Sequence, residues 1–367
     1  MQVLEFTFKV LTICGCWRPE SWTSKYKRII YRVYTVLIIL LVNSFTLSQF
    51  MDIILIADNP DDVSDNFCIL LPMFISCYKL LSLLANHKRI VKLTNILTKE
   101  PCKPSKPNEM KIYYKFDKGI QLNTFHYAAL GLVTCISITF ISLLTDFGER
   151  KLTYRAWVPF DYSSTIVFCM LYAHQLICLN MAALLNVACD GLICGLLVHI
   201  CCQFEILAYR LRKIMLYSNT LRNCVRQHCK IFRFAVIVNA TFRMVITTQL
   251  LISMLVVCFN LYQLTQMGIS ARCIRLAMFM CCMLTQIFVY CWYGNEVKLK
   301  SRQFIDSIFQ IEWLEMDTHL KKSLIIIMKR TTMPIEITSA YTISMNLDSF
   351  MGILKTSYSA YNLLKQM

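Results

Sequence analysis

Polar and charged side chains recur at steps of three and four residues near the end of the chain, within Ser339–Leu363. A helix of that length would span roughly 37 Å, enough to cross a bilayer with some tilt. The spacing puts the side chains on one stripe, and charges at membrane depth are expensive unless they face water or a partner. We expect this helix to line a water-filled pore. The stripe comprises Ser344, Asp348, Met351, Lys355, Tyr358, Asn362 and Lys365.

A second stripe on the same stretch carries mostly small residues, which let membrane helices approach closely. Its members are Thr342, Asn346, Ser349, Gly352, Thr356 and Ser359. The two stripes predict a helix that faces water on one side and packs against other helices on the other. The alternative is a span buried in a helix bundle with its charges paired.

The whole chain is too apolar for a soluble globular protein: 56% of its residues are hydrophobic, 16% are charged and the mean hydropathy is +0.50. A net charge of +16 could suggest nucleic acid, but the basic residues gather beside apolar spans, so no nucleic-acid partner is expected. The nineteen cysteines lie mostly in apolar runs or in cytoplasmic stretches. Neither zinc spacing nor a catalytic constellation is present, so we expect no metal, no cofactor and no enzyme.

The fold class expected from these features is an all-α membrane protein with seven transmembrane helices. The apolar runs predict spans at Ile29–Phe50, Phe67–Leu84, Thr124–Leu144, Ser164–His199, Met244–Leu264, Ile274–Tyr293 and Ser339–Leu363. The fourth span continues as an amphipathic helix through Ile214, which implies that it projects into the cytoplasm. Another amphipathic helical segment, Ser301–Lys329, is predicted between the last two spans.

The distribution of Lys and Arg fixes the orientation of these spans. The N-terminus and the even-numbered connections carry 29 of these residues, whereas the odd-numbered connections and the C-terminal tail carry five. This bias predicts a cytoplasmic N-terminus and an extracellular C-terminus. The predicted organisation is a cytoplasmic N-terminus (1–28) with a short helix on the membrane surface, six spans (29–294), a cytoplasmic helical anchor (295–338) and a pore-lining seventh span (339–367).

Several segments from residue 157 onward carry a family likeness. They are Trp157–Tyr162, Asn186–Cys194, Gln203–Leu207, Tyr290–Glu296, Ile327–Arg330 and Ile353–Ser359. In order and spacing they resemble the insect odorant receptors, and among these the variable tuning subunits rather than the shared co-receptor.

This resemblance implies a ligand-gated, non-selective cation channel in the plasma membrane of sensory neurons. A tuning subunit would assemble with co-receptor subunits into a heterotetramer, with subunit contacts concentrated in the anchor. It would bind a small hydrophobic odorant in the outer half of the bundle, among spans two, three, four and six. The last helix would line the pore, with a narrow gate at Asn362 and a second pore position at Lys365. Trp313 is expected at the anchor interface, because Trp is favoured at interface centres.

The ligand-binding candidates are outer-half residues of those four spans, rich in aromatic and Met side chains that suit volatile hydrophobic molecules. They are Leu70, Leu71, Phe74, Phe140, Ile141, Leu144, Tyr162, Phe168, Leu171, Tyr172, Met278, Met280, Met283 and Gln286. His174 and Gln175 could orient a polar ligand group, although interhelical hydrogen bonds are the stronger expectation. Asp190 is expected to pair with an Arg or Lys from the cytoplasmic side.

Two other receptor classes compete with this interpretation. A G-protein-coupled receptor needs the reverse orientation, and its Asp-Arg-Tyr and Asn-Pro-x-x-Tyr motifs are missing from spans three and seven. A gustatory receptor of the same superfamily would share the topology and the pore, but its usual C-terminal pattern differs from Ile353–Ser359.

Overall fold

A computed structural model describes residues 4–19, 21–56, 60–213, 219–266, 271–310, 318–339 and 343–366. Over these residues the chain is almost entirely helical. In order it forms α1 (Glu5–Ile13), α2 (Lys25–Leu55), α3 (Pro60–Ala85), α4 (His87–Thr98), α5 (Pro107–Thr145), α6 (Thr165–Arg212), α7 (Asn219–Gln266), α8 (Ala271–Phe309), α9 (Thr318–Thr331) and α10 (Leu347–Gln366). A short antiparallel hairpin, β1 (Thr338–Ser339) and β2 (Ile343–Ser344), precedes α10.

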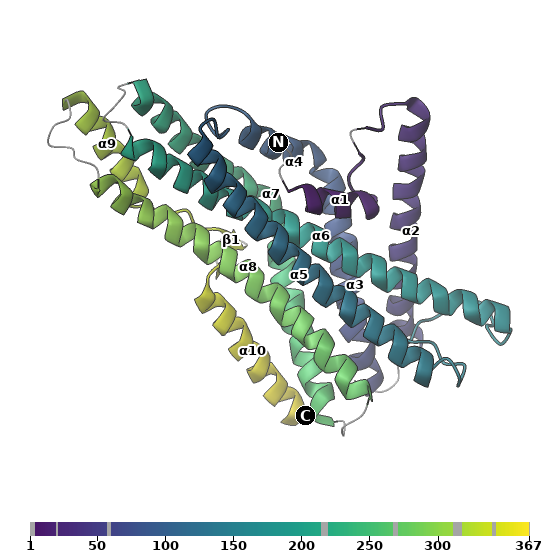
Figure 1. The fold of residues 1–367 in the computed structure, drawn as a ribbon. Helices are drawn as coiled ribbons and strands as arrows, with labels where there is room; N and C mark the ends of the chain where they lie inside the picture. The colour runs from purple at the N-terminus through teal and green to yellow at the C-terminus, as the bar shows by residue number, and fades with distance from the viewer. Residues whose placement is uncertain are drawn as a thin grey trace.

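Among the described residues, six helices are long and apolar enough to cross a membrane: α2, α3, α5, α6, α7 and α8. The seventh is α10, whose 20 residues reach about 30 Å and whose polar side chains lower its hydropathy. The chain is therefore an all-α, multi-pass membrane protein with seven transmembrane helices. Figure 1 shows the two termini at opposite ends of the bundle, as an odd number of spans requires.

The central helix of the bundle is α6. Every residue from Val187 to Phe204 is buried, and α6 contacts α1, α2, α3, α5, α7 and α8. A helix that is hydrophobic on all sides must be enclosed by others, and this composition explains its position. Its 48 residues extend for about 72 Å, which is much longer than a bilayer is thick. The predicted extension of the fourth span beyond the bilayer is thereby confirmed, although Ile214 lies outside the described residues.

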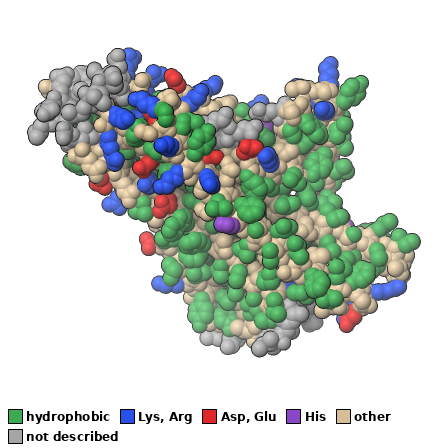
Figure 2. Space-filling view, viewed as in Figure 1, with side chains coloured by type: hydrophobic (Ala, Val, Ile, Leu, Met, Phe, Trp, Pro, Cys, Tyr) green, Lys and Arg blue, Asp and Glu red, His purple; other side chains and the backbone are tan. Residues whose placement is uncertain are grey.

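The cytoplasmic end of the bundle is distinct in composition. Figure 2 shows hydrophobic side chains over the lower part of the visible face, whereas Lys, Arg, Asp and Glu gather at the upper left, over the end that carries α9 in Figure 1. The long helices α5, α6, α7 and α8 all reach this end and form the anchor together with α9. The six-span region and the anchor have no break at residue 294, because α8 runs through it without interruption.

Three sequence expectations about the helices are wrong in detail. The segment Ser301–Lys329 is not one helix, since its first part continues α8 to Phe309 and its last part lies in α9. The last span begins at Leu347 rather than Ser339, because Ser339 lies in β1 and Ile343 and Ser344 lie in β2. The short N-terminal helix, expected on the membrane surface, instead packs on α6, with Leu4 and Leu11 buried in the core.

Candidate ligand cavity and pore helix

A cavity of about 90 Å³ lies between α3, α5, α6 and α8, and we refer to it as the central cavity. Its walls are mostly apolar or small, with a few hydrogen-bonding groups among them. The lining residues are Ile69, Pro72, Met73, Ser76, Tyr127, Gly131, Thr134, Cys135, Ile138, Leu179, Ala182, Ala183, Asn186, Val187, Phe279, Cys282, Met283 and Gln286. An apolar cavity with a few convergent polar groups is the usual form of a small-molecule site.

A buried polar network centred on Asp190 borders this cavity. The Asp190 carboxylate accepts hydrogen bonds from Lys79 Nζ at 2.5 Å, Tyr290 OH at 2.6 Å and Gln286 Nε2 at 2.5 Å. Lys79 also donates to Asn186 Oδ1 at 2.9 Å. The Lys79 and Asp190 side chains are 0% and 3% exposed, so each charge has its partner inside the bundle.

The network extends from α6 to α3, α7 and α8. Asn186 Nδ2 donates to Ser76 Oγ at 2.7 Å, and Gln249 Nε2 of α7 donates to Gln286 Oε1 at 2.8 Å. Ser76, Asn186 and Gln286 line the cavity as well, so its polar groups are members of the network. The basic partner predicted for Asp190 is confirmed as Lys79, which lies within span two, toward the cytoplasmic end of that span, rather than in a connection between spans. The signal was present, since Lys79 and Asp190 are both isolated charges in apolar spans.

A more polar cavity of about 260 Å³ adjoins the central cavity toward the extracellular end, and we call it the outer vestibule. Ile69, Ile138 and Phe279 line both. The fully buried Gln49 amide also lines the vestibule and has no hydrogen-bond partner among the described residues. Buried polar groups are normally satisfied, so the vestibule is suited to hold water or a polar group of a ligand.

Two of the fourteen predicted ligand residues, Met283 and Gln286, line the central cavity. Phe74, Phe140, Leu144 and Tyr162 are exposed on the outside of the single chain. Phe168 and Tyr172 are buried but pack with Phe147, at ring distances of 5.7 and 5.1 Å. The others are buried or half-buried and do not line the cavity: Leu70, Leu71, Ile141, Leu171, Met278 and Met280.

The ligand residues predicted on α5 do not line the central cavity for a geometric reason. Its cavity residues, Tyr127, Gly131, Thr134, Cys135 and Ile138, follow the helical steps of three and four that define one face. The predicted positions on this helix begin beyond Ile138, so they lie closer to its extracellular end. Hydrophobicity alone cannot select the face of a helix that turns toward a cavity, because the lipid-facing side is equally apolar.

His174 and Gln175 make the structural contacts that were the stronger expectation. Gln175 Nε2 donates to the Tyr154 carbonyl at 2.9 Å and its Oε1 accepts from the Tyr154 N–H at 3.2 Å. His174 Nε2 lies 3.0 Å from Ser44 Oγ of α2. Neither side chain lines the central cavity.

The stripe predicted for the pore lies on the open side of α10. Asp348, Met351, Lys355 and Tyr358 are exposed and Asn362 is half-exposed in the single chain. Ser344 belongs to β2 rather than to the helix. Lys365 lies in the last turn, where the structure describes only the backbone, and Trp313 lies outside the described residues.

The opposite side of α10 packs on α7 and α8, but not through the predicted stripe of small residues. Gly352, Thr356 and Ser359 are exposed, and a Cβ at Gly352 would meet nothing within 4 Å. The packed side instead carries larger groups. Phe350 approaches Phe288 with a ring distance of 5.6 Å, and the buried Ser357 donates to the Met254 carbonyl at 3.3 Å.

The start of α10 is fixed against α7 and α8. A Cβ added at Gly294 of α8 would lie only 2.5 Å from Met345 Cβ and from the Met345 carbonyl oxygen. In the hairpin, Thr338 pairs with Asn239 and Ser339 Oγ donates to Thr247 Oγ1 at 2.9 Å. A displacement of α8 near Gly294 would therefore reach Met345, two residues before the start of α10.

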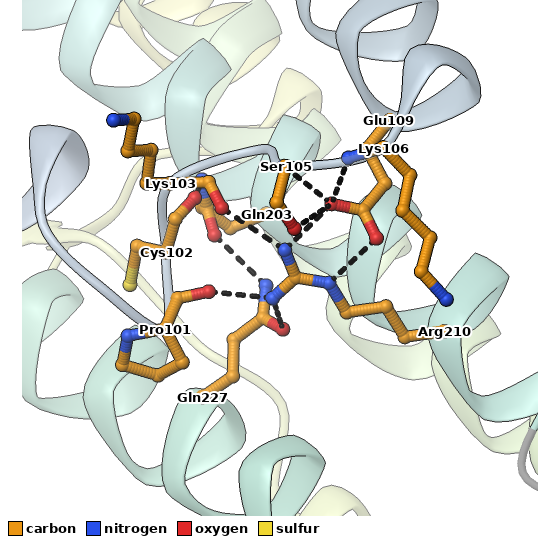
Figure 3. Close-up of polar contacts among 9 residues, drawn as sticks. All are labelled: Pro101, Cys102, Lys103, Ser105, Lys106, Glu109, Gln203, Arg210 and Gln227. Atoms are coloured by element: carbon orange, nitrogen blue, oxygen red, sulfur yellow. Dashed lines mark hydrogen bonds and ion pairs between the residues drawn. The ribbon is translucent and has the colours of Figure 1, made fainter. Parts of the chain in front are cut away.

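In the anchor, Arg210 of α6 holds the Pro-rich segment that precedes α5 (Figure 3). Its guanidinium donates to Glu109 at 2.7 and 3.0 Å, to the Pro101 and Lys103 carbonyls, and to Gln227 Oε1 at 2.7 Å. Burial alone would raise the Glu109 pKa, but the hydrogen bonds from Arg210 and from the segment's backbone outweigh it and lower the pKa. Residues 101–107, whose prolines cannot continue a helix, thus form an ordered connection between α4 and α5.

Comparison with known proteins identifies the family. The model of the family described as 7tm Odorant receptor matches residues 59–358. The chain belongs to this family. The match decides against the G-protein-coupled receptor and gustatory alternatives, and the relatives are receptors rather than enzymes.

Individual odorant receptors resemble the chain over most of its length. Odorant receptor 46a, isoform A, of Drosophila melanogaster is 26% identical, with 79% of this chain and 78% of that protein covered. Odorant receptor Or1 of Anopheles gambiae is 24% identical, with 97% and 93% covered. The olfactory receptor OR5 from Machilis hrabei, solved in complex with eugenol, shares the fold with a TM-score of 0.88 at 18% identity, over 99% of this chain and 97% of that chain.

Proposed function

We propose that this chain is a tuning subunit of an odorant-gated cation channel. It would bind a small hydrophobic molecule in the central cavity and open a pore lined by α10 together with co-receptor subunits. The observation that carries the proposal is that α8 contributes to the cavity wall and also supports the start of α10. Gln286, Tyr290 and Gly294 follow one another at steps of four, so they lie on one face of α8. Gln286 lines the cavity, Tyr290 donates to Asp190, and Gly294 contacts Met345.

The ligand would be held mostly by burial of apolar surface, at about 25 cal/mol per Å². Met73, Met283 and Phe279 supply adaptable or aromatic contacts, while Ser76 and Asn186 offer hydrogen bonds. The outer vestibule gives such a molecule a route from the extracellular side.

Opening would follow from a shift in population between two states. A ligand can favour the open state only by as much as its affinity differs between the two. Ligand against Gln286 would move α8 relative to α6, and the tight Gly294–Met345 contact would pass the movement to the first turn of α10. Asn362 lies near the other end of the same helix, where we propose the gate.

The charges of α10 favour a mixed channel. In a tetramer of this chain alone, Lys355 would form a ring of four cations on the exposed stripe, and rings of positive charge favour anions. One such subunit beside co-receptors adds a single cation, which Asp348 on the same stripe can offset. The plasma membrane of a sensory neuron is the expected location of such a channel.

The test is whole-cell current from the full chain, with and without an insect odorant co-receptor, under a panel of volatiles. We expect odour-evoked cation current only when the two are expressed together. Robust cation current from this chain alone would contradict the heteromeric proposal. Surface labelling of the C-terminus, accessible from outside the cell, confirms that each sample contains receptor at the plasma membrane.

A further inference from the structure

A second and larger cavity lies on the cytoplasmic side of the central one. This inner cleft has a volume of about 510 Å³ between α5, α6 and α8, and its lining includes Asp190, Phe288 and Trp292. Asn123 Nδ2 of α5 donates to the Tyr293 hydroxyl of α8 at 2.6 Å and bridges the cleft. The residue that lines both the inner cleft and the central cavity is Tyr127.

Of the side chains that separate the two cavities, Tyr127 is the one held by a weak hydrogen bond. Asp190 of the cleft and Gln286 of the cavity are joined by a 2.5 Å hydrogen bond, which closes the wall on the side of α6 and α8. Tyr127 closes it on the side of α5, and its hydroxyl donates to Asp190 Oδ2 at 3.4 Å. That distance is beyond the usual range for an O–H···O bond. If Tyr127 turned away, Asp190 would keep Lys79, Gln286 and Tyr290 as donors, so the loss would be small.

The volumes indicate why this wall matters. Small-molecule sites usually measure roughly 300–1,000 Å³, and the central cavity, at about 90 Å³, is well below that range. The inner cleft, at about 510 Å³, falls within it by itself, so a molecule too long for the central cavity finds room by extending past Tyr127. Tyr127 is half-buried at the boundary of the two cavities, so rotation of its ring would join them without displacing the charged pair.

We propose that Tyr127 sets the length of ligand that this receptor accepts, and that long ligands carrying a hydroxyl occupy the central cavity and the inner cleft together. This inference rests on the proposed function, because it takes the central cavity as the ligand site. When Tyr127 turns away, Asp190 Oδ2 loses one donor, and a ligand hydroxyl replaces it. A carboxylate ligand would be repelled by Asp190, and an ester or ketone has no proton to donate there. The ligand class that we propose is a linear or weakly branched alcohol, whose hydroxyl can donate to Asp190 and whose alkyl chain suits the mostly apolar walls of the central cavity.

The experiment uses primary alcohols of four to twelve carbons on wild type, Tyr127→Ala and Tyr127→Phe. Phe125→Ala is the matched control, since this aromatic residue lies on the same helix, is 55% exposed and lines neither cavity. Two readouts are taken: half-maximal concentrations for current in cells that also express the co-receptor, and thermal stabilisation of the purified full chain in lipid nanodiscs.

For Tyr127→Ala we expect the ratio of the half-maximal concentrations for decanol and hexanol to fall at least tenfold. Tyr127→Phe should shift it less, because the ring remains but is no longer held by Asp190. Phe125→Ala should match wild type. An equal loss of potency at every chain length would overturn the proposal, as would failure of every alcohol to stabilise the protein.

The two readouts separate this proposal from the proposed function. One outcome is that thermal stabilisation depends on alcohol chain length and that this dependence changes in Tyr127→Ala, while no current is evoked. That outcome would support the role of Tyr127 and contradict the channel function. Evoked current with the same length preference in all variants would support the channel function and contradict the role of Tyr127.

Discussion

Asp190 holds three short hydrogen bonds at a depth where an uncompensated charge is expensive. Its pairing with Lys79 joins α3 to α6, and the donors from α8 join the helix that contacts α10. The ion pair fixes how α3 and α6 lie against each other more than it stabilises the fold. Replacing both members of a buried ion pair by apolar residues often costs little stability, whereas replacing only one leaves the other charge buried without a partner.

Lys79→Met should therefore destabilise the receptor strongly, by roughly 3–5 kcal/mol, because Asp190 is left as an unpaired buried carboxylate. The double variant Lys79→Met with Asp190→Asn should recover part of that loss, since the charge is removed. Thermal unfolding in detergent measures both. Losses that simply add in the double variant would contradict the pairing.

The Glu109–Arg210 bridge predicts a pH dependence of anchor stability. Because the Glu109 pKa is lowered in the folded state, the stabilisation is fully present above the ordinary Glu pKa of about 4.3. It is lost as the pH falls through the lowered value, where the folded protein also takes up the proton. Glu109→Gln should lower the thermal unfolding midpoint at pH 7. Below the ordinary Glu pKa, the midpoint of this variant should fall less steeply with decreasing pH than the midpoint of wild type. Glu205→Gln should change little, because the Glu205 side chain is 42% exposed and lies 3.2 Å from Lys300 in a solvent-accessible pair.

At the scale of elements, α8 is the helix that the mechanism depends on. It is continuous from the extracellular end of the bundle to the anchor, so a movement at the cavity need not cross a loop to reach Gly294. The close contact there requires the absence of a side chain, because an added Cβ would overlap both Met345 Cβ and its carbonyl oxygen.

Gly294→Ala should displace the start of α10 and impair gating, while ligand-induced thermal stabilisation stays close to wild type. Gly119→Ala is the matched control, since a Cβ there meets nothing within 4 Å. The readouts are evoked current per surface receptor and stabilisation by ligand. Normal current in Gly294→Ala would show that α8 does not transmit movement through this contact.

The sequence predicted the helices better than it predicted their faces. Long apolar runs determine spans directly, which is why the six apolar spans and the long projection of α6 are found as expected. The last span begins later than predicted because β1 pairs with β2 ahead of α10, and hydrophobic periodicity does not reveal such a pairing. Phe140 and other predicted ligand residues do not line the cavity. Which side of a helix lines the cavity depends on how α3, α5, α6 and α8 are rotated against each other.

At the scale of the whole molecule, the exposed stripe of α10 is a surface that the single chain leaves uncovered. In a membrane this stripe must face water or other subunits, because Asp348 and Lys355 are charged. The proposed heteromeric channel would account for both charges, and it would make ion selectivity a property of the assembly.

Lys355→Glu should increase the permeability of the co-expressed channel to divalent cations relative to sodium, because a cation in the pore is replaced by an anion. Lys355→Met should give an intermediate value. Reversal potentials under bi-ionic conditions measure the change. Identical reversal potentials for all three receptors would exclude Lys355 from the conduction path.

The central claim is that occupancy of the central cavity opens the channel, and filling that cavity tests it most directly. Ala183 lines the cavity, whereas Ala173, ten residues earlier on the same helix, is exposed and lines none of it. The measurement is odour-evoked current per surface receptor for Ala183→Phe and Ala173→Phe with the co-receptor. We expect at least a tenfold loss of potency in Ala183→Phe and wild-type responses in Ala173→Phe. Equal responses in the two variants would contradict the account.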